Sequence, residues 1–153
     1  MNEITSSWAL NDTQLNRNLT FPLDEDTYGF EIRFVRQIIG VQPITPLPDQ
    51  PEYVKGVVNL RGQIIPIIDI RLRFGKVEKS YDERTCIIIL DIMEMTVGVI
   101  VDSVSEVVTI TDESITIAPE FKGVDSRFIR GIGRIDDNAY ILINCAELVV
   151  PEN

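Results

Sequence analysis

Histidine is absent from this chain of 153 residues, and cysteine occurs only twice. The lack of histidine removes the most common general base near neutral pH and the most common metal ligand. It also leaves every serine and both cysteines without the side chain that usually activates them as nucleophiles. Cys86 and Cys145 lie within apolar runs, which favours buried free thiols over a disulfide or a nucleophile.

Basic residues are also scarce, because 14 Lys and Arg stand against 24 Asp and Glu and give a net charge of -10. Nucleic acids and anionic membranes select clustered cations, so neither is an expected partner. No apolar run approaches the roughly 20 residues that span a bilayer, and the start of the chain lacks the basic and apolar regions of a signal peptide. We therefore expect a cytoplasmic protein with no direct membrane insertion.

Motifs for enzyme chemistry are missing as well. Gly131-Ile132-Gly133 lacks the third glycine of a dinucleotide-binding loop and falls in a predicted hairpin. The paired acidic residues fall in predicted turns, where solvated carboxylates are expected, and no loop follows the EF-hand pattern. We expect no catalytic residue, metal or cofactor. A hydrolase that uses two carboxylates stays open at this point, since a sequence does not show how far apart they lie.

The most informative stretch runs from Tyr53 to Phe74. The β-branched pairs Val57-Val58 and Ile64-Ile65 flank Asn59-Leu60-Arg61-Gly62, whose Asn and Gly are typical of a turn. This pattern predicts a hairpin that lifts Arg61 away from the apolar strands. Pro66 cannot donate to a β-ladder, so its strand is expected at a sheet edge or with a bulge.

The same stretch is basic. From Lys55 to Lys76 five cations stand against one Asp69, a local charge of +4 that leaves -14 for the rest of the chain. One interpretation is a core hairpin with ordinary surface arginines. The other is a basic island, residues 55–76, on an acidic body.

From Val54 to Phe74 the chain reads V-K-G-V-V-N-L-R-G-Q-I-I-P-I-I-D-I-R-L-R-F. This segment resembles the signature of the CheW family, and its most specific part is the turn at 59–62 followed by Pro66 and Asp69. Members of that family are adaptors that couple methyl-accepting chemoreceptors to the histidine kinase CheA. The resemblance implies a non-enzymatic chemotaxis adaptor, recruited to membrane-bound receptor arrays. Its implied partners are the cytoplasmic tip of a receptor and the regulatory domain at the carboxyl end of CheA.

The pattern along the chain favours β structure. Short strands at close spacing, with little helix between them, indicate small barrels and not a parallel α/β sheet. The spacing of Val35, Ile38 and Ile39 predicts a short helical turn, and residues 145–150 a short helix. Residues 27–39 match 96–108, and residues 53–57 match 128–132, at offsets of 69 and 75. Such an internal repeat predicts two similar lobes that bury apolar surface against each other.

The family resemblance implies a mostly β fold of two five-stranded, SH3-like barrels packed side by side, with a groove between them and short helices. We expect residues 1–17 to form a mobile or loosely docked N-terminal extension, with Trp8 covering part of the barrel surface as the alternative, and residues 18–150 to form the CheW-like domain. Its two intertwined lobes would span mainly 28–80 and 85–143, with the terminal segments packing across.

Carried over by position, the receptor-binding surface implied by the resemblance includes Ile32, Val35, Gln37, Arg61, Ile87, Val104 and Val107. Gly56 and Gly98 match backbone positions near the contacts. For each apolar member the alternative is a plain core residue. Arg61 is the leading candidate, either as a receptor contact or as a support of the groove through loop carbonyls. The family usually carries Glu at position 37, so Gln37 would replace a salt bridge to a basic receptor residue by a neutral hydrogen bond.

Three alternatives fit parts of the pattern. A CheV-like coupling protein would add a receiver domain, for which a chain ending at Asn153 leaves no room. A detached regulatory domain of CheA would have the same fold. From a different class, a small β-barrel enzyme or ligand-binding protein would show turnover or tight binding of a small molecule.

Overall fold

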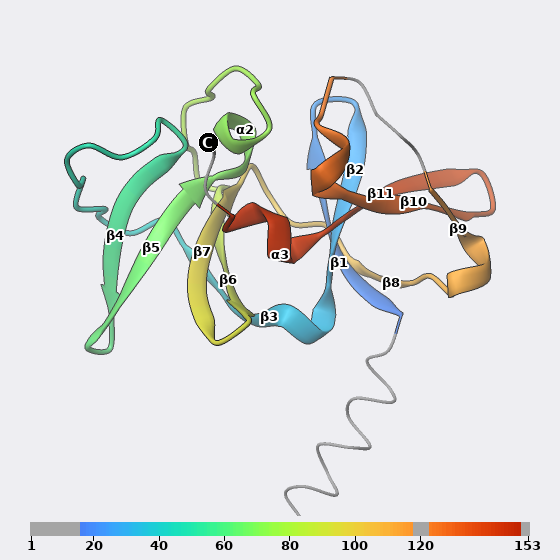
Figure 1. Cartoon of the computed structure of the whole chain (residues 1–153), viewed down its shortest axis with the longest axis horizontal. Coiled ribbons are helices and arrows are strands. Elements are labelled where there is room, and N and C mark those ends of the chain that lie inside the picture. Colours follow the sequence, from blue (N-terminus) through green and yellow to red (C-terminus); the bar gives the residue numbers. More distant parts are fainter. Residues whose placement is uncertain (1–15, 118–122, 151–153) are drawn as a thin grey trace, which may run out of the picture.

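The structure is a computed structural model that describes residues 16–117 and 123–150. Their strands form two sheets that lie side by side (Figure 1). Sheet A contains β1 (Arg17–Leu23), β2 (Asp26–Glu31), β8 (Val107–Thr109), β9 (Ile115–Thr116), β10 (Ile129–Ile135) and β11 (Asn138–Ile143). Sheet B contains β3 (Val35–Gly40), β4 (Val54–Leu60), β5 (Gln63–Asp69), β6 (Cys86–Ile92) and β7 (Met95–Val101). The short helices are η1 (Ile32–Phe34), α2 (Ile70–Arg73), η2 (Asp112–Ser114), η3 (Ser126–Phe128) and α3 (Cys145–Leu148).

The expected mostly β architecture is confirmed, and the internal repeat appears as a shared strand order. Sheet A runs β8-β1-β2-β11-β10-β9 and sheet B runs β3-β6-β7-β5-β4. In each sheet a central parallel pair, β2 with β11 or β7 with β5, joins two antiparallel hairpins. Matching register shifts at Val54/Gly56 and Ile129/Gly131 are 75 positions apart, as the sequence match predicts.

The chain divides between the sheets differently from the expected lobes 28–80 and 85–143. Sheet B takes all its strands from residues 35–101, whereas sheet A combines residues 17–31 with 107–143. The difference arises because the chain crosses between sheets twice, through η1 after β2 and through residues 102–106 after β7. Each repeat therefore gives its first hairpin to one sheet and its remaining strands to the other.

Sheet A also has one strand more than expected. Its edge strand β9 pairs with β10, while in sheet B the matching contact is a single bridge between Thr45 and Val57. That bridge carries the chain that follows β3 across to β4, the opposite edge of sheet B. Sheet B is thereby curled toward closure, which gives a barrel-like wall to its interior.

The largest hydrophobic cluster lies between the sheets. It contains Phe21, Tyr28 and Phe30 from sheet A together with Ile88 and Leu90 from β6. The other face of β6 supplies Ile87 and Ile89 to a second cluster inside sheet B. Both faces of β6 are therefore buried, which places this strand at the centre of the molecule.

The position of Pro66 corrects one prediction, because β5 is not an edge strand and the register shift lies in β4. Pro66 faces Val57, whose N–H and C=O both bond to Thr45 at 2.9 Å. The Val57–Pro66 pair is therefore a non-hydrogen-bonded one, and the proline nitrogen points away from β4. On that side the pairing with β7 begins only at Ile67, so no ladder bond is lost.

The helical turn predicted through Val35, Ile38 and Ile39 is also displaced. The turn is η1, which ends at Phe34, and residues 35–40 form β3. Pairing with the buried strand β6 overrides the local spacing of apolar residues.

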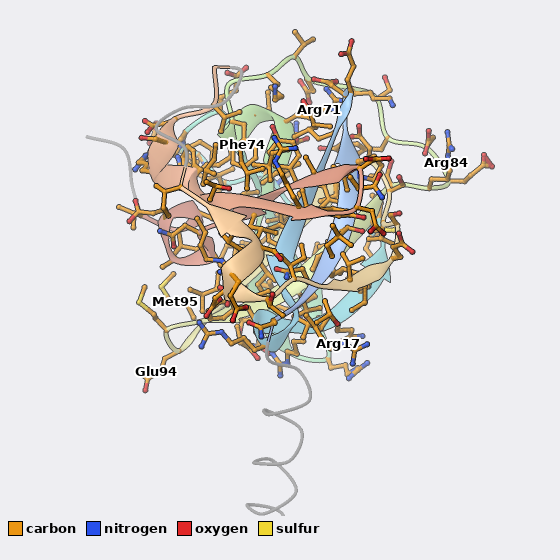
Figure 2. The ribbon with its side chains drawn as sticks, turned by 90° about the vertical axis from the view of Figure 1, so that its right-hand side faces the viewer. Arg17, Arg71, Phe74, Arg84, Glu94 and Met95 are labelled. Carbon is orange, nitrogen blue, oxygen red and sulfur yellow. The ribbon has the colours of Figure 1, made fainter. Side chains whose placement is uncertain are left out.

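The two ends of the molecule are formed by different elements (Figure 2). Arg71 and Phe74, from α2 and the residue after it, lie at one end. The turn between β6 and β7, with Glu94 and Met95, lies at the other end together with Arg17 at the beginning of β1. Over the described ranges, no helix has the length and apolar character needed to cross a membrane.

Tyr28 generates a pH-dependent prediction. Its side chain is fully buried, and its hydroxyl has no hydrogen-bond partner among the described residues. Burial, followed by the charges of Asp26 and Asp24, raises the pKa of Tyr28 from 10.0 to about 12. The folded state holds this proton more tightly than the unfolded state, so the contribution is complete below pH 10.0 and is lost as the pH rises toward about 12.

We expect Tyr28→Phe to keep the stability of the wild type at pH 7, because it removes a buried hydroxyl without a partner. Between pH 10 and 12 the variant should lose less free energy of unfolding than the wild type, by on the order of 2 kcal/mol. Urea unfolding at a series of pH values measures both. An equal alkaline loss in the two proteins would contradict the assignment.

Candidate protein-interaction surface

Arg61 lies at the tip of the β4–β5 hairpin, as predicted. Arg61 and Gly62 form the turn with φ angles of 54° and 86°, and Asn59 Oδ1 accepts a hydrogen bond of 2.8 Å from the Gly62 N–H. The side chain of Arg61 is exposed and makes no hydrogen bond or ion pair to another described residue. Within residues 16–117 and 123–150, the guanidinium of Arg61 bonds no loop carbonyl, so it is available to a partner.

Arg36 ties the hairpin tip to β3. Its Nη1 donates to Gln63 Oε1 at 3.3 Å and lies 3.7 Å from Asp91 Oδ1, so one side chain connects β3, β5 and β6. Arg36 is also the residue at which β3 shifts register against β6. Arg61 therefore lies near the beginning of β3, where Val35 and Gln37 were expected to contribute.

The register shift sends Val35 and Gln37 to different faces of β3. Val35 packs against the cluster between the sheets, whereas Ile39, on the same face as Gln37, packs against the cluster inside sheet B. The half-buried amide of Gln37 makes no hydrogen bond to another described residue. The face of Val35 continues through Ile38, whose side chain is 42% exposed.

Ile38 is a member of this surface that the sequence analysis missed. The three apolar positions at 35, 38 and 39 indicated a helical turn, and a helix would have placed all of them on one face. Strand alternation with one extra residue was the signal that could have separated Ile38 from Ile39.

Three further candidates lie around the two crossovers between the sheets. Ile32 in η1 and Val104 in the 102–106 segment are half-buried against the cluster between the sheets. Val107 begins β8 opposite Leu19 and is 38% exposed. Thr20 fixes the second crossover, because its Oγ1 donates to Glu106 O at 2.6 Å and accepts from Glu106 N at 3.1 Å. Figure 1 shows β1, β3 and β8 along one side of the molecule, where the two sheets meet.

Ile32, Val35 and Val104 thus all pack, partly buried, against the inter-sheet cluster, and Ile38 lies on the same face of β3 as Val35. We call these four residues the inter-sheet rim. All four are apolar and partly exposed. Ile32 and Val104 lie in the two crossovers, whereas Val35 and Ile38 lie in β3 of sheet B.

The structure places Ile87 and two glycines differently from the rest. Ile87 is 0% exposed inside sheet B, so the expectation of a surface contact is wrong for the free chain. Gly98 is buried, and a Cβ there would come within 2.5 Å of Ile67 Cδ1 and 2.8 Å of Ile87 Cγ2. Gly56 has φ +140°, and a Cβ would collide with the backbone carbonyl of Thr45. Both glycines serve the packing of sheet B.

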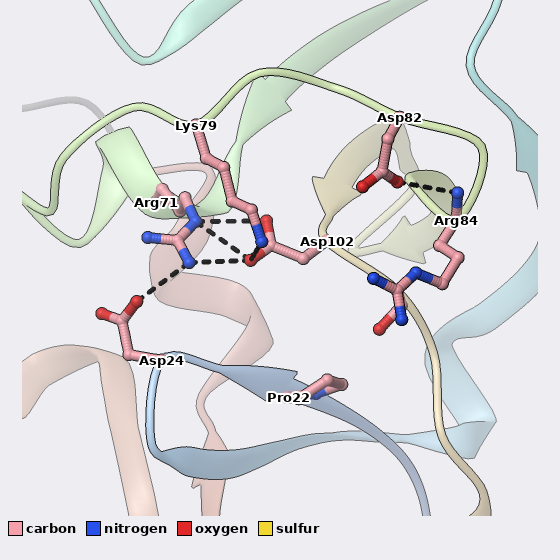
Figure 3. A pocket seen from close by; sticks show the side chains of 8 residues that line it. Pro22, Asp24, Arg71, Lys79, Asp82, Arg84 and Asp102 are labelled. Atoms are coloured by element: carbon pink, nitrogen blue, oxygen red, sulfur yellow. Dashed lines mark hydrogen bonds and ion pairs between the residues drawn. The ribbon is translucent and has the colours of Figure 1, made fainter.

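The basic island of residues 55–76 is largely neutralised within the chain. Arg71 is 8% exposed and binds Asp102 through both carboxylate oxygens, at 2.7–3.1 Å, and Asp24 Oδ1 at 2.9 Å (Figure 3). These hydrogen bonds raise the pKa of the guanidinium further and keep it charged. Lys55 lies 2.7 Å from Glu78, and Lys76 lies 3.9 Å from Asp24. Arg61 is left as the exposed cation that the hairpin presents.

The guanidinium of Arg73 is also engaged in hydrogen bonds within the chain. Its Nε donates to Leu148 O at 2.9 Å, and its Nη2 donates to Val150 O at 2.6 Å and Glu147 O at 3.2 Å. The guanidinium also lies 4.1 Å from the ring centre of Tyr53 and 4.8 Å from that of Phe128. Arg73 therefore binds the unpaired carbonyls at the end of α3, which favour a cation.

Groups suited to catalysis do not converge on this surface. In the part of the chain that the structure describes, no cluster of three or more His, Cys, Asp or Glu side chains could hold a metal ion. Cys86 and Cys145 are free thiols, and burial raises the pKa of both, that of Cys145 to about 12. Such thiols are protonated near neutral pH and are poor nucleophiles.

The two-sheet scaffold is duplicated, and it presents an apolar rim and, at the β4–β5 turn, an exposed guanidinium without a partner among the described residues. Residues 17–152 match the family model for the CheW-like domain. The chain therefore belongs to the CheW-like family, which confirms the resemblance of the 54–74 segment.

Individual relatives agree with this assignment. The chain is 38% identical to a chemotaxis protein CheW of Klebsiella aerogenes over 135 residues, which cover 88% of this chain and 81% of that one. It is 37% identical to a probable chemotaxis protein CheW of Rhizobium etli, over 85% of this chain and 84% of that one. Among solved structures, the scaffolding protein TtCheW from Thermoanaerobacter tengcongensis superposes with a TM-score of 0.82 at 36% identity, covering 90% and 89% of the two chains.

Gly56 provides a test of how rigidly the hairpin is held. Gly56→Ala combines an unfavourable φ with a collision against the backbone of Thr45, so we expect a loss of about 3 kcal/mol or more in the free energy of unfolding. Gly62→Ala is the matched control, because its φ of +86° is also positive but a Cβ would meet nothing within 4 Å. The control should lose about 1–2 kcal/mol. Equal losses, measured by urea unfolding, would show that the contact with Thr45 is unimportant.

Proposed function

We propose that this chain is a non-enzymatic chemotaxis adaptor that holds a chemoreceptor and the histidine kinase CheA together. The observation that carries the proposal is the pairing of CheW-like family membership with the inter-sheet rim of Ile32, Val35, Ile38 and Val104. The adaptor works at the cytoplasmic tips of receptor arrays. It contributes binding surfaces and no chemistry.

The receptor-binding surface is the inter-sheet rim together with Arg61, Gln37 and Val107. A helical hairpin such as a receptor tip presents apolar side chains that need a partly exposed apolar strip, and a polar group beside it fixes register. Arg61 supplies that polar group without first breaking an internal ion pair. Gln37 offers a neutral amide where the family usually carries a carboxylate, so the receptor residue opposite it need not be basic.

The surface for CheA lies on the outer side of sheet B. Among the described residues, β4 pairs with β5 along its length on one side but only with Thr45 on the other. Ile64, 58% exposed, and Leu47, 43% exposed, point out beside this nearly unpaired edge. An open edge with apolar side chains suits a second barrel that adds its own edge, as a related regulatory domain would.

The two surfaces share one rigid scaffold, since Arg36 joins β3 of the receptor surface to β5 of the kinase surface. A change in receptor state that alters its grip on β3 is therefore transmitted to the hairpin that faces the kinase. Coupling of this kind is a free energy shared between two binding sites.

Arg61→Ala tests the polar fixing point. We expect it to weaken binding to a purified cytoplasmic receptor fragment about 10-fold, in the range of an interface hot spot, and to leave the urea midpoint unchanged. Arg84→Ala is the control, because Arg84 is equally exposed and lies beside the polar cavity of Figure 3. Titration by calorimetry gives both affinities. Wild-type affinity of a folded Arg61→Ala variant would exclude Arg61 from the receptor surface.

Ile38→Lys tests the apolar rim. A lysine at this position places a charge among the side chains that the receptor would bury, so receptor binding should fall by at least about 10-fold while binding to the CheA regulatory domain stays unchanged. Val77→Lys, at a side chain 82% exposed in the loop after α2, should change neither affinity. Loss of both partners with Ile38→Lys, or of neither, would contradict the assignment of two separate surfaces.

A further inference from the structure

The internal repeat places two equivalent niches in the molecule, and only one of them is filled. In sheet A the niche holds an aromatic trio, because the ring of Phe74 lies 5.6 Å from Tyr28 and 5.3 Å from Phe128. Phe74 follows α2, which leaves sheet B, so this helix end packs across onto sheet A. The trio fills the space between the helix end and the strands.

The three equivalent positions in sheet B carry smaller side chains in total. At the offsets of 69 and 75, Tyr28 corresponds to Val97, Phe74 to Val149 and Phe128 to Tyr53. The strand registers agree, since Gly29 lies opposite Leu142 as Gly98, 69 positions later, lies opposite Ile67, 75 positions earlier. Both pairs are parallel neighbours in their sheets. Two valines thus stand where the other niche has a tyrosine and a phenylalanine.

A cavity of about 230 Å³ occupies this position. We call it the α3 pocket, and its apolar walls are Tyr53, Pro66, Ile68, Met95, Leu148 and Val149. Gln50 and Thr96 add polar groups to the lining. The pocket is smaller than the roughly 300–1,000 Å³ of sites for small-molecule ligands. An apolar cavity of about 150 Å³ already takes benzene, so the α3 pocket has room for a larger aromatic side chain.

The chain contains an aromatic side chain on a tether long enough to cross much of the molecule. Trp8 is the only tryptophan and precedes Arg17 by nine residues, which span up to about 30 Å when extended. That reach is twice the radius of gyration of about 14 Å expected for a domain of this size. Arg17 and Met95, which lines the pocket, lie at the same end of the molecule (Figure 2). Gln50 and Thr96 offer oxygens to the indole N–H, which needs a partner when buried.

We propose that the N-terminal segment folds back over this end of the molecule and seats Trp8 in the α3 pocket. Trp8 then takes the place that Phe74 and Tyr28 fill in the other niche. This contact is intramolecular and does not depend on the adaptor function. A partner that used the α3 pocket would first have to displace the indole.

Because Trp8 is the only indole in the chain, its fluorescence reports directly on the proposal. In the purified full-length protein we expect emission at shorter wavelength than in the urea-unfolded chain, together with protection from acrylamide quenching. Neither property should change when the protein is diluted.

Two substitutions in the pocket should abolish the shift. Val149→Phe copies the counterpart Phe74 and fills the cavity from within, and Met95→Lys places a charge in its wall. Each should move the emission of Trp8 to the position found in urea and restore quenching, with circular dichroism confirming the fold. Val150→Phe and Met93→Lys are the matched controls, since these neighbours do not line the pocket and should keep the wild-type spectrum.

Three results would overturn the proposal. Emission in the native protein at the urea position would show that the indole is exposed, including the case in which it becomes buried only after a receptor or kinase fragment is added. A shift that disappears on dilution would assign the pocket to Trp8 of a second copy. A shift that persists in both pocket variants would place the indole elsewhere.

Discussion

The ion pairs of Arg71 join parts of the chain that are far apart in the sequence. Arg71 lies in α2, which leaves sheet B, and it binds Asp24 in the β1–β2 turn of sheet A and Asp102 in the crossover back to sheet A. Two residues along, Arg73 binds the carbonyls at the end of α3. Removing Arg71 would leave the partly buried Asp102 and the more exposed Asp24 without their partner, and removing Arg73 would leave the carbonyls at the end of α3 without theirs. A helix of four residues thereby adds polar ties between the sheets to the hydrophobic cluster that lies between them.

Duplication explains the framework, and divergence between the copies explains the surfaces. The turns of the β4–β5 and β10–β11 hairpins are equivalent, with φ angles of 54° at Arg61 and 55° at Asp136, yet they carry opposite charges. One niche between helix end and sheet is filled by aromatic rings, and the other contains a cavity. Two copies of one topology can therefore offer chemically different surfaces to partners. The shared core between the sheets holds the two copies in a fixed arrangement.

An adaptor of this kind needs rigidity more than reactivity. Exposed apolar side chains cost little in a monomer when they are few and dispersed, and they become useful when a partner covers them. The crossovers through η1 and residues 102–106 carry Ile32 and Val104 on short segments that are anchored at both ends. The hydrogen bonds between Thr20 and Glu106 further restrain the 102–106 crossover. Anchoring at both ends keeps small the ordering entropy that these segments would lose when a partner binds.

The sequence by itself determined the β character, the hairpin turn at Arg61, the repeat and the family, because turn chemistry, strand length and a 21-residue signature are local properties. Only the tertiary structure decided which residues are surface. Ile87 is a core residue, whereas Ile38 is partly exposed and belongs to the inter-sheet rim. Arg71 and Arg73 bind acceptors within the chain. The structure also decided how the two sheets divide the chain, since exchange of hairpins between sheets leaves no mark on strand periodicity. Burial and ion pairing depend on which distant strands and turns come together, and a pattern of period two carries no record of that.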